Sequence, residues 1–513
     1  MIASVPAATL LGVEGQPVVV EVHVSAGLPM FTVVGLPDAA CREARDRVRA
    51  ALLSSGLAWP IKRITVNLAP ADVRKGGSSL DLPIAVGVLV ASGSLPVGRV
   101  EGIAFLGELG LDGTVRRIPG VVPLVDALRC REVVVPAFCE HDARAVGNCV
   151  VRPVGTLCEL VDALLGVAPW PSPSPIPRAR CSARHVPDLA DVRGQEAARF
   201  ALQVAAAGGH HLLLAGPPGA GKTMLAQRLP GLMPDLDSQQ ALEVLRVRSA
   251  AGLSSGEGPD LRPPFRAPHH SSSMVALIGG GSLAMRPGEL SLAHRGVLFL
   301  DELGEFPPSV LDSLRQPLEE GVVRVARARG SVTLPARFQL VAATNPCPCG
   351  WARSEDAGFR LPDEPVCSCS PALRYRYARR LSGPLLDRID LRLEVRRPHV
   401  DSLLGPPGRS TADTRQTVAD ARLRAAERGL DSNSAMAPAE LDRWAPLSPG
   451  ALSLVDGLLR RGAITARGLD RVRRVARTIA DLAGSGLGAP LGDEPVCMAL
   501  ELRRPVAIEA DVA

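Results

Sequence analysis

Residues 208–227 read GGHHLLLAGPPGAGKTMLAQ, and this stretch decides the fold of the segment around it. Within it, residues 211–215 form a short apolar run, typical of a strand buried on both faces. The loop that follows fits G-x-x-x-x-G-K-[ST], and a helical pattern begins at its last residue. Between a strand and a helix N-terminus, such a glycine loop wraps nucleotide phosphates with backbone N–H groups. We therefore predict that the nucleotide is bound by Gly216, Pro217, Pro218, Gly219, Ala220, Gly221, Lys222 and Thr223.

A second apolar strand pattern ends in two acidic residues. Residues 296–300 read GVLFL and are followed by Asp301 and Glu302. After a phosphate-binding loop at this spacing, Thr223 and Asp301 are expected to hold Mg²⁺, while Lys222 reaches the β- and γ-phosphates. Glu302 is expected to polarise the attacking water. ATP and Mg²⁺ are the predicted cofactors.

Composition sets the general class of protein. The 513 residues are 46% hydrophobic, which is ample for about two to four packed domains. A net charge of +5 is too small to argue for nucleic-acid binding by itself. The first residues show no signal-peptide pattern, and the longest apolar run, residues 82–95, is too short to span a bilayer. We expect a cytoplasmic protein with reduced cysteines and no membrane partner.

The pattern along the chain predicts an α/β fold in four segments. Five prolines within residues 168–178 exclude a helix or an inner strand, so a linker is expected there. Strand patterns occupy residues 18–24, 31–35, 64–68 and 133–136, and helical patterns occupy 39–54 and 81–91. The predicted segments are an α/β domain over 1–168, a Pro-rich linker over 169–187, an α/β/α P-loop core over 188–398 and a helical domain over 399–513.

Several longer motifs resemble the YifB/ComM group of Mg-chelatase-like AAA+ ATPases. They are RAPHH at 266–270, GELSLAHRG at 288–296, NPCPCG at 345–350 and LSGPLLDRID at 381–390. This resemblance covers nearly the whole chain. It implies a ring, a hexamer by analogy, with ATP bound between subunits and a helical lid at the C-terminal end. Separately, DVRGQ at 191–195 resembles the segment that packs near the adenine in AAA+ proteins in general.

The resemblance also assigns roles to polar residues outside the two nucleotide motifs. Asn345, after the apolar strand pattern at 340–344, matches the sensor that orients water or the γ-phosphate; the alternative is a turn-forming Asn before a proline. In such rings an arginine completes the neighbouring subunit's site. Arg388 matches this finger best, Arg380 is the second candidate, and Arg467 matches the second sensor that touches the γ-phosphate. The alternative for Arg388 and Arg380 is a salt bridge to Asp387 or Asp390. The alternative for Arg467 is an ordinary surface arginine.

The first 168 residues resemble the Lon-protease-like fold, also described as ribosomal S5 domain 2-like. The matching stretches are GLPD at 35–38, NLAPAD at 67–72 and GELGLDG at 107–113. Lon-type proteolysis uses a serine activated by a lysine. Alignment places Ser79 at the serine position but Val122 at the lysine position, and valine cannot accept a proton. We predict a non-proteolytic domain in which Ser79 caps the following helix.

Two insertions distinguish this group of AAA+ proteins. Residues 266–289, with three consecutive glycines, predict a flexible loop within the second helix of the core. Residues 322–336 predict a hairpin with Gly330 in its turn. Arginines crowd this hairpin, and by resemblance both insertions face the pore, where arginines hold a phosphate backbone. The predicted DNA contacts are Arg324, Arg327 and Arg329; a solvated charged hairpin is the alternative.

Two C-x-C pairs lie beside the sensor strand. Four thiolates at two short spacings suit tetrahedral Zn²⁺, although C-x-C is less diagnostic than C-x₂-C. The candidate zinc ligands are Cys347, Cys349, Cys367 and Cys369.

These features together predict an ATP hydrolase that moves a polymer through its pore. The resemblance implies a DNA helicase that promotes branch migration during recombination of incoming DNA. One alternative is a chelatase-type motor that acts on a porphyrin with partner subunits, and the N-terminal domain speaks against it. The other is an ATP-gated scaffold, and the intact catalytic residues Lys222, Asp301, Glu302 and Asn345 speak against that.

Overall fold

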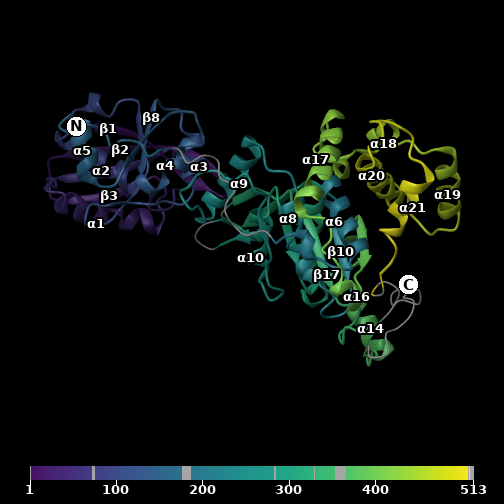
Figure 1. Ribbon diagram of the computed structural model, residues 1–513. Helices are drawn as coiled ribbons and strands as arrows, with labels where there is room; N and C mark the ends of the chain where they lie inside the picture. The colour runs from purple at the N-terminus through teal and green to yellow at the C-terminus, as the bar shows by residue number, and fades with distance from the viewer. Residues whose placement is uncertain are drawn as a thin grey trace.

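The computed structural model describes residues 2–71, 75–175, 187–281, 285–327, 330–352, 365–398, 400–506 and 508. Figure 1 shows an N-terminal body in purple, a central body in teal and green, and a C-terminal group of helices in yellow beside it. Of the predicted linker, residues 169–175 and 187 form neither helix nor strand, and residues 176–186 lie outside the described residues.

The N-terminal body contains two main sheets. The first has the order β1-β2-β4-β3, with β3 and β4 parallel and the other pairs antiparallel. The second is the parallel sheet β5-β8-β9. The strands are β1 Ile2–Leu11, β2 Glu14–Ser25, β3 Met30–Val34, β4 Arg63–Ala69, β5 Ile103–Phe105, β8 Glu132–Pro136 and β9 Val150–Val154, with the short pair β6 Glu108–Leu109 and β7 Val115–Arg116.

Alternating side chains explain how these sheets are packed. In β2, Val18, Val20, Val22 and Val24 point into the core, where the almost entirely buried helix α2 lies against β1 and β2. The predicted elements at 18–24, 31–35, 64–68, 133–136, 39–54 and 81–91 are confirmed as β2, β3, β4, β8, α1 and α2. The helices are α1 Ala39–Ser54, α2 Asp81–Ser92, α3 Val121–Ala127, α4 Glu140–Arg144 and α5 Leu157–Leu165.

The prediction that Ser79 caps a helix is wrong. Ser79 lies inside a 3₁₀ turn, Ser78–Leu80, and no side chain caps the N-terminus of α2. Instead, the first turn of α2 contains Asp81, whose carboxylate accepts hydrogen bonds from Arg47 Nε (2.7 Å) and Nη2 (2.9 Å). A carboxylate in the first turn stabilises the positive end of the helix dipole, so a serine cap is not needed there. Val122, at the position of the absent lysine, is fully buried in α3.

The central body is built on one parallel sheet with the order β11-β14-β17-β10-β18. Every residue of β10, β14 and β17 is buried, as expected for strands covered on both faces. The strands are β10 Leu212–Ala215, β11 Phe265–Arg266, β14 Val297–Leu300, β17 Gln339–Thr344 and β18 Leu391–Glu394. Because parallel strands end at one edge, the loops after β10, β14 and β17 meet there.

Helices and two strand pairs surround this sheet. The helices are α6 Glu196–Gly208, α7 Lys222–Ala226, α8 Leu229–Leu232, α9 Ser238–Ala250, α10 Met274–Ile278, α11 Glu289–Leu292, α12 Pro308–Ser313, α13 Arg315–Glu320, α14 Pro371–Ala378, α15 Gly383–Leu386 and α16 Val400–Leu404. The predicted hairpin is confirmed as β15 Val322–Arg327 paired with β16 Gly330–Pro335, but Gly330 is not in its turn: it is the first residue of β16 and pairs with Arg327.

The first insertion is more regular than predicted. Residues 266–289 contain α10 and the antiparallel pair β12 Gly279–Gly280 with β13 Arg286–Pro287, so a continuous flexible loop is the wrong description. The Ser273 side chain caps α10 by accepting from Ala276 N. A Cβ at Gly279 would lie 2.5 Å from the Arg286 carbonyl oxygen, so the glycine permits close strand pairing rather than flexibility.

The C-terminal part consists of helices joined by a buried charge network. The helices are α17 Thr411–Glu427, α18 Pro438–Trp444, α19 Pro449–Arg460, α20 Ala466–Leu482 and α21 Asp493–Glu501. Asp481 of α20 accepts from Arg428 Nη1 (2.8 Å) and Arg477 Nε (3.1 Å), and all three side chains are fully buried. Buried charges require such pairing. A hydrogen bond of 2.8 Å between His210 and Thr478 fixes α20 beside the start of β10.

The described part of the chain contains no helix with the length and apolar character needed to cross a membrane.

Candidate functional site

The phosphate-binding loop leaves the carboxyl end of β10 at the centre of the parallel sheet. A Cβ at Gly216 would lie 2.1 Å from the Val395 carbonyl oxygen, so only glycine fits beside the chain that follows β18. Gly221, immediately before α7, has φ of 89°, a conformation that glycine adopts without strain. These two positions explain why the loop needs its glycines.

The Lys222 side chain lies across the loop that precedes it. Its Nζ donates to the carbonyl oxygens of Gly216 (2.7 Å) and Pro217 (3.0 Å) and to Asn345 Oδ1 (3.1 Å). Burial lowers the pKa of Lys222, while the nearby carboxylates of Asp301 and Glu302 favour its charged form. The predicted lysine and the predicted sensor asparagine are therefore in direct contact.

Thr223 and Asp301 provide adjacent oxygen ligands at the end of β14. Thr223 Oγ1 donates to Asp301 Oδ2 at 2.7 Å. Hydroxyl and carboxylate oxygens are the ligands that Mg²⁺ prefers, so the pair fits the predicted metal. Both residues line a cleft of about 420 Å³ together with residues 218–222, Met224, Glu302, Thr344 and Asn345. The structure brings the predicted nucleotide and Mg²⁺ residues into one cleft, apart from Gly216 and Pro217, which contact Lys222 behind it.

Glu302 has an unusual backbone and an unpredicted partner. Its φ of 51° places a non-glycine residue in the left-handed region, which costs about 1–3 kcal/mol and recurs at functional sites. Its Oε2 lies 3.0 Å from His270 Nδ1, in the RAPHH motif after β11. The His270 ring also makes an edge-on contact with the ring of Phe306, which directly follows the 3₁₀ turn η5, Leu303–Glu305. The sequence supplied the motif but gave no signal for this long-range pair.

Gln195, the last residue of the DVRGQ segment, holds the base of the loop. Its Nε2 donates to the carbonyl oxygens of Ala220 (3.2 Å) and Arg396 (2.7 Å). The side chain thus joins the phosphate-binding loop to the segment after β18. This contact places residues 191–195 beside the nucleotide loop.

Arg388 does not line the nucleotide cleft of its own chain. It lines a separate cavity that also contains Asp390 and Arg471. Its guanidinium pairs with Glu319 of α13 rather than with either nearby aspartate. The other candidate, Arg380, donates to the Gly304 carbonyl oxygen (2.9 Å) and pairs with Glu305 (3.0 Å).

Arg467 is also absent from the cleft around its own phosphate-binding loop. It is exposed at the start of α20, and no residue of α20 lines that cleft. One turn further along the helix, Arg471 Nη1 donates to the Arg388 carbonyl oxygen at 3.2 Å and pairs with Asp390. Residues four apart share a helix face, so Arg467 lies on the side of the molecule that carries Arg388.

The hairpin β15–β16 has one apolar and one polar face. Val323, Val325, Val332 and Leu334 are buried in a cluster that includes Val13 of the N-terminal body. Arg324, on the other face, is exposed and pairs with Glu320 at 2.8 Å. Arg329 and the side chain of Arg327 lie outside the described residues, so the predicted contact at the hairpin tip stays a prediction.

The predicted zinc ligands converge. The sulfur atoms of Cys347 and Cys349 lie 3.3 Å apart, and those of Cys347 and Cys367 lie 3.7 Å apart. With Cys369, all four sulfurs lie within 4.8 Å of one another.

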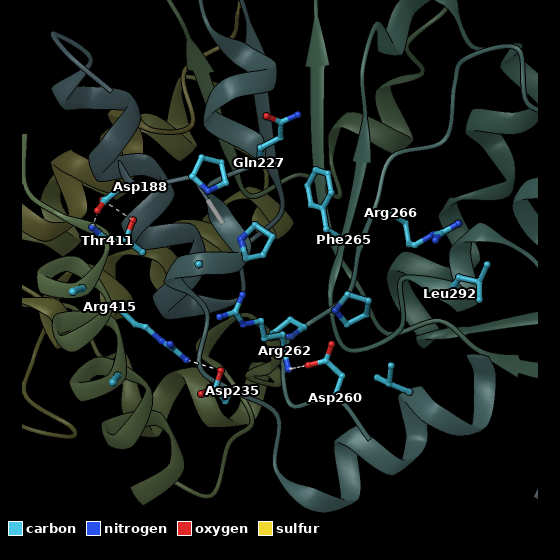
Figure 2. Close-up of a pocket in the computed structure, with 18 of the residues that line it drawn as sticks. Asp188, Gln227, Asp235, Asp260, Arg262, Phe265, Arg266, Leu292, Thr411 and Arg415 are labelled. Carbon is cyan, nitrogen blue, oxygen red and sulfur yellow. Dashed lines mark hydrogen bonds and ion pairs between the residues drawn. The ribbon is translucent and has the colours of Figure 1, made fainter. Parts of the chain in front are cut away.

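A larger cavity, of about 1130 Å³, lies between the central body and α17 (Figure 2). Several of the charged side chains that line it are already paired: Arg415 with Asp235 at 2.7 Å, and Asp188 Oδ1 with the Thr411 hydroxyl at 2.9 Å. It contains neither the lysine nor the acids of the phosphate-binding motifs. The smaller cleft, which holds the lysine and the acids of these motifs, is therefore the candidate nucleotide site.

A parallel sheet with a glycine-rich P-loop after one strand, two acids after a second and an asparagine after a third fits a P-loop protein of the AAA+ class. Comparisons with known proteins specify the family. Residues 188–403 match the family model described as magnesium chelatase, subunit ChlI; residues 20–138 match subunit ChlI of Mg-chelatase; residues 408–503 match the ChlI C-terminal model.

Full-length relatives agree with the family models. The chain is 41% identical to the protein YifB of Escherichia coli and 42% identical to the competence protein ComM of Haemophilus influenzae, in each case over 92% of both chains. It is 47% identical to a protein of Mycobacterium tuberculosis over 96% of this chain and 97% of that one. The chain belongs to the YifB/ComM family of Mg-chelatase-like AAA+ proteins.

Proposed function

We propose that this protein hydrolyses ATP in a ring of identical subunits and uses the energy to move DNA. The observation that carries the hydrolysis is the direct contact of predicted catalytic groups in one cleft: Lys222 with Asn345, and Thr223 with Asp301. These four groups come from three separate stretches of the sequence and meet around one loop, which matches what phosphoryl transfer requires.

Each side chain then has a definite task. The Lys222 ammonium, now hydrogen-bonded to loop carbonyls and Asn345, binds the β- and γ-phosphates. Thr223 and Asp301 hold Mg²⁺, which neutralises charge on the phosphate oxygens when bound. Glu302 accepts the proton of the attacking water, and Asn345 orients that water or the γ-phosphate. In this structure Glu302 lines the cleft while its Oε2 contacts His270 Nδ1, and we propose that this contact restrains Glu302 and is broken when it acts as the base.

We propose that the site is completed by a neighbouring subunit. Arg388 and Arg467 are absent from the lining of their own chain's cleft and lie on one side of the molecule. In a closed ring that side faces the next subunit's nucleotide, where Arg388 acts as the finger and Arg467 as the second sensor. Arg380 is less suitable, because it is engaged with Gly304 and Glu305 beside its own catalytic acids. A hexamer is the ring size we propose.

DNA is the proposed substrate of the motion, with branch migration during recombination of incoming DNA as the activity. One full-length relative is named a competence protein, and the hairpin presents a solvent-facing arginine on its polar face. Arg324, Arg327 and Arg329 are the proposed contacts with the phosphate backbone. In this proposal the N-terminal domain is a non-proteolytic Lon-like module and the C-terminal helices form the lid.

A chelatase-type motor is the second candidate function. Residues 20–138 match a model described as a chelatase subunit, so the N-terminal domain does not separate the two functions as the sequence argument assumed. The arginines of the hairpin favour a polyanion over a porphyrin. An ATP-binding scaffold is the third candidate. It would not hydrolyse ATP and so would not need a carboxylate such as Glu302 in the lining of the cleft.

Zn²⁺ is the third proposed ligand, after ATP and Mg²⁺. Three of the four cysteine sulfurs are 3.3–3.7 Å apart, close to the spacing of about 3.8 Å between sulfurs around tetrahedral zinc with Zn–S bonds of about 2.3 Å.

The test is steady-state phosphate release by the purified protein, alone and with single-stranded, duplex or forked DNA, and with a porphyrin and Mg²⁺ as the comparison. Lys222→Ala is the control for contaminating ATPases. DNA-stimulated hydrolysis that Lys222→Ala abolishes supports the proposal. Stimulation by porphyrin alone would move the chain to the chelatase-type function.

A further inference from the structure

The cysteine cluster adjoins a turn that contacts the phosphate-binding loop. Cys347 follows the sensor Asn345 by two residues and is fully buried. Its sulfur lies 3.7 Å from that of Cys367, on a segment 20 residues further along the chain. A disulfide has its sulfurs about 2.05 Å apart, so these are unbonded thiols gathered at the spacing of a metal site. An Fe–S cluster places a core of several atoms between its thiolates and requires a wider spacing.

The chain between the cysteine pairs contacts the loop through Gly350. A Cβ on Gly350 would lie 2.5 Å from Pro218 Cδ, so its backbone packs directly against the phosphate-binding loop. Gly350 N donates to the Cys347 carbonyl oxygen at 2.9 Å, and Ala352 N donates to the Cys347 sulfur at 3.2 Å. An N–H donor to a ligating sulfur is a typical outer-shell contact of a metal-bound thiolate. The turn that holds Cys347 is thus the turn that packs on Pro218.

A second contact reaches the same proline. The Arg397 guanidinium lies 4.7 Å above the Trp351 ring, and Trp351 adjoins Gly350. Arg397 Nη2 donates to the Pro218 carbonyl oxygen at 2.9 Å, and its Nε donates to the same oxygen at 3.3 Å. The cation–π contact fixes the guanidinium plane and so directs both donors at one loop carbonyl. Pro218 is therefore contacted by Gly350 and by Arg397, whose guanidinium stacks on Trp351.

We infer that a zinc ion held by Cys347, Cys349, Cys367 and Cys369 braces the phosphate-binding loop, so that nucleotide affinity depends on zinc occupancy. In the described parts of this segment, residues 347–352 and 365–370, no strand or helix holds the cysteines in place, so in this proposal the metal fixes residues 347–352 against Pro218. Without the metal, Trp351 is no longer held in place and the guanidinium of Arg397 loses its contact with the Trp351 ring. The loop then samples conformations that do not bind phosphate. This inference rests on the proposed binding of ATP at the loop.

The first measurement is metal content and nucleotide affinity on the same preparation of full-length protein. Elemental analysis of protein purified without chelator should find one zinc per chain. After zinc has been removed with a chelator and Mg²⁺ has been added back, the protein should bind a fluorescent ATP analogue about tenfold more weakly. This factor is expected if the loop then adopts its phosphate-binding conformation for about a tenth of the time. Added Zn²⁺ should restore it.

Two variants separate the brace from a merely structural metal. Trp351→Ala should keep its zinc and still bind nucleotide more weakly, whereas Trp351→Phe, which retains an aromatic face for Arg397, should bind nearly as wild type. Cys369→Ser should lose zinc and affinity together, while Cys158→Ser, at an exposed thiol of the N-terminal body, should change neither.

The outcomes are distinguishable. Wild-type protein that binds nucleotide but holds no zinc, or holds iron in its place, would overturn the zinc site and leave the proposed function intact. Zinc-bearing protein whose nucleotide affinity is unchanged by zinc removal and by Trp351→Ala would overturn the brace. Zinc-bearing wild type that binds no nucleotide would overturn the proposed function, and the brace with it.

Discussion

Glu302→Gln should separate nucleotide binding from hydrolysis. The Glu302 carboxylate contacts His270 at 3.0 Å, while the loop carbonyls and Asn345 are contacted by Lys222. Glutamine has the same shape, keeps an oxygen acceptor for His270 and bears the same backbone φ of 51° at no added cost. The substitution therefore removes the proton acceptor and leaves the phosphate-binding groups in place.

The size of the effect follows from the role assigned to Glu302. A positioned general base contributes about 10²–10⁴-fold to a rate. Hydrolysis should fall by this factor, which corresponds to about 3–5 kcal/mol of transition-state stabilisation. The dissociation constant for ATP should change by less than about threefold, since the lost interaction is made only in the transition state.

The assay is phosphate release under saturating ATP, paired with a titration of a fluorescent ATP analogue. Glu305→Gln is the matched control, because Glu305 is also a half-exposed carboxylate near the same strand end but pairs with Arg380. It should leave the rate of hydrolysis near that of wild type. Hydrolysis by Glu302→Gln at the wild-type rate would show that Glu302 is not the base and that the assignment at the end of β14 is wrong.

His270→Ala should free the Glu302 carboxylate and raise kcat while ATP affinity stays within about twofold. His269→Ala, at the adjacent ring that does not pair with Glu302, should leave kcat nearly unchanged. Equal effects of the two alanine variants on kcat would remove the special role of His270. Replacing Arg327 and Arg329 together with glutamine should weaken DNA binding and flatten the dependence of log affinity on log salt by about 0.7–0.9 per lost phosphate contact. Unchanged affinity and slope would mean that the hairpin arginines are only solvated charges.

The sequence predicted the parts of the site that depend on local patterns. The glycine loop, Lys222, Thr223 and the Asp301–Glu302 pair each follow a buried apolar strand, and parallel strands necessarily bring their carboxyl ends together. The contacts of Lys222 with Asn345 and of Thr223 with Asp301 are consequences of that one rule.

Features that depend on long-range packing were not predictable. His270 and Glu302 are 32 residues apart, and nothing in either motif specifies their pairing. The contact of Arg388 with Glu319 depends on how α13 packs, so proximity in sequence wrongly suggested a nearby aspartate as its ion-pair partner. The Ser79 cap failed because one turn of 3₁₀ helix precedes α2, and helix boundaries shift by a residue or two with such turns.

In the proposed ring, Lys222 of one subunit and Arg388 of the neighbouring subunit act on the same ATP. Lys222→Ala and Arg388→Ala proteins should each be nearly inactive, Arg388→Ala by about 10³-fold with its ATP affinity retained. Mixed in equal amounts before ATP is added, they should recover about a quarter of wild-type hydrolysis, because one interface in four then combines an intact lysine with an intact arginine. A mixture no more active than its components would contradict hydrolysis across a subunit interface.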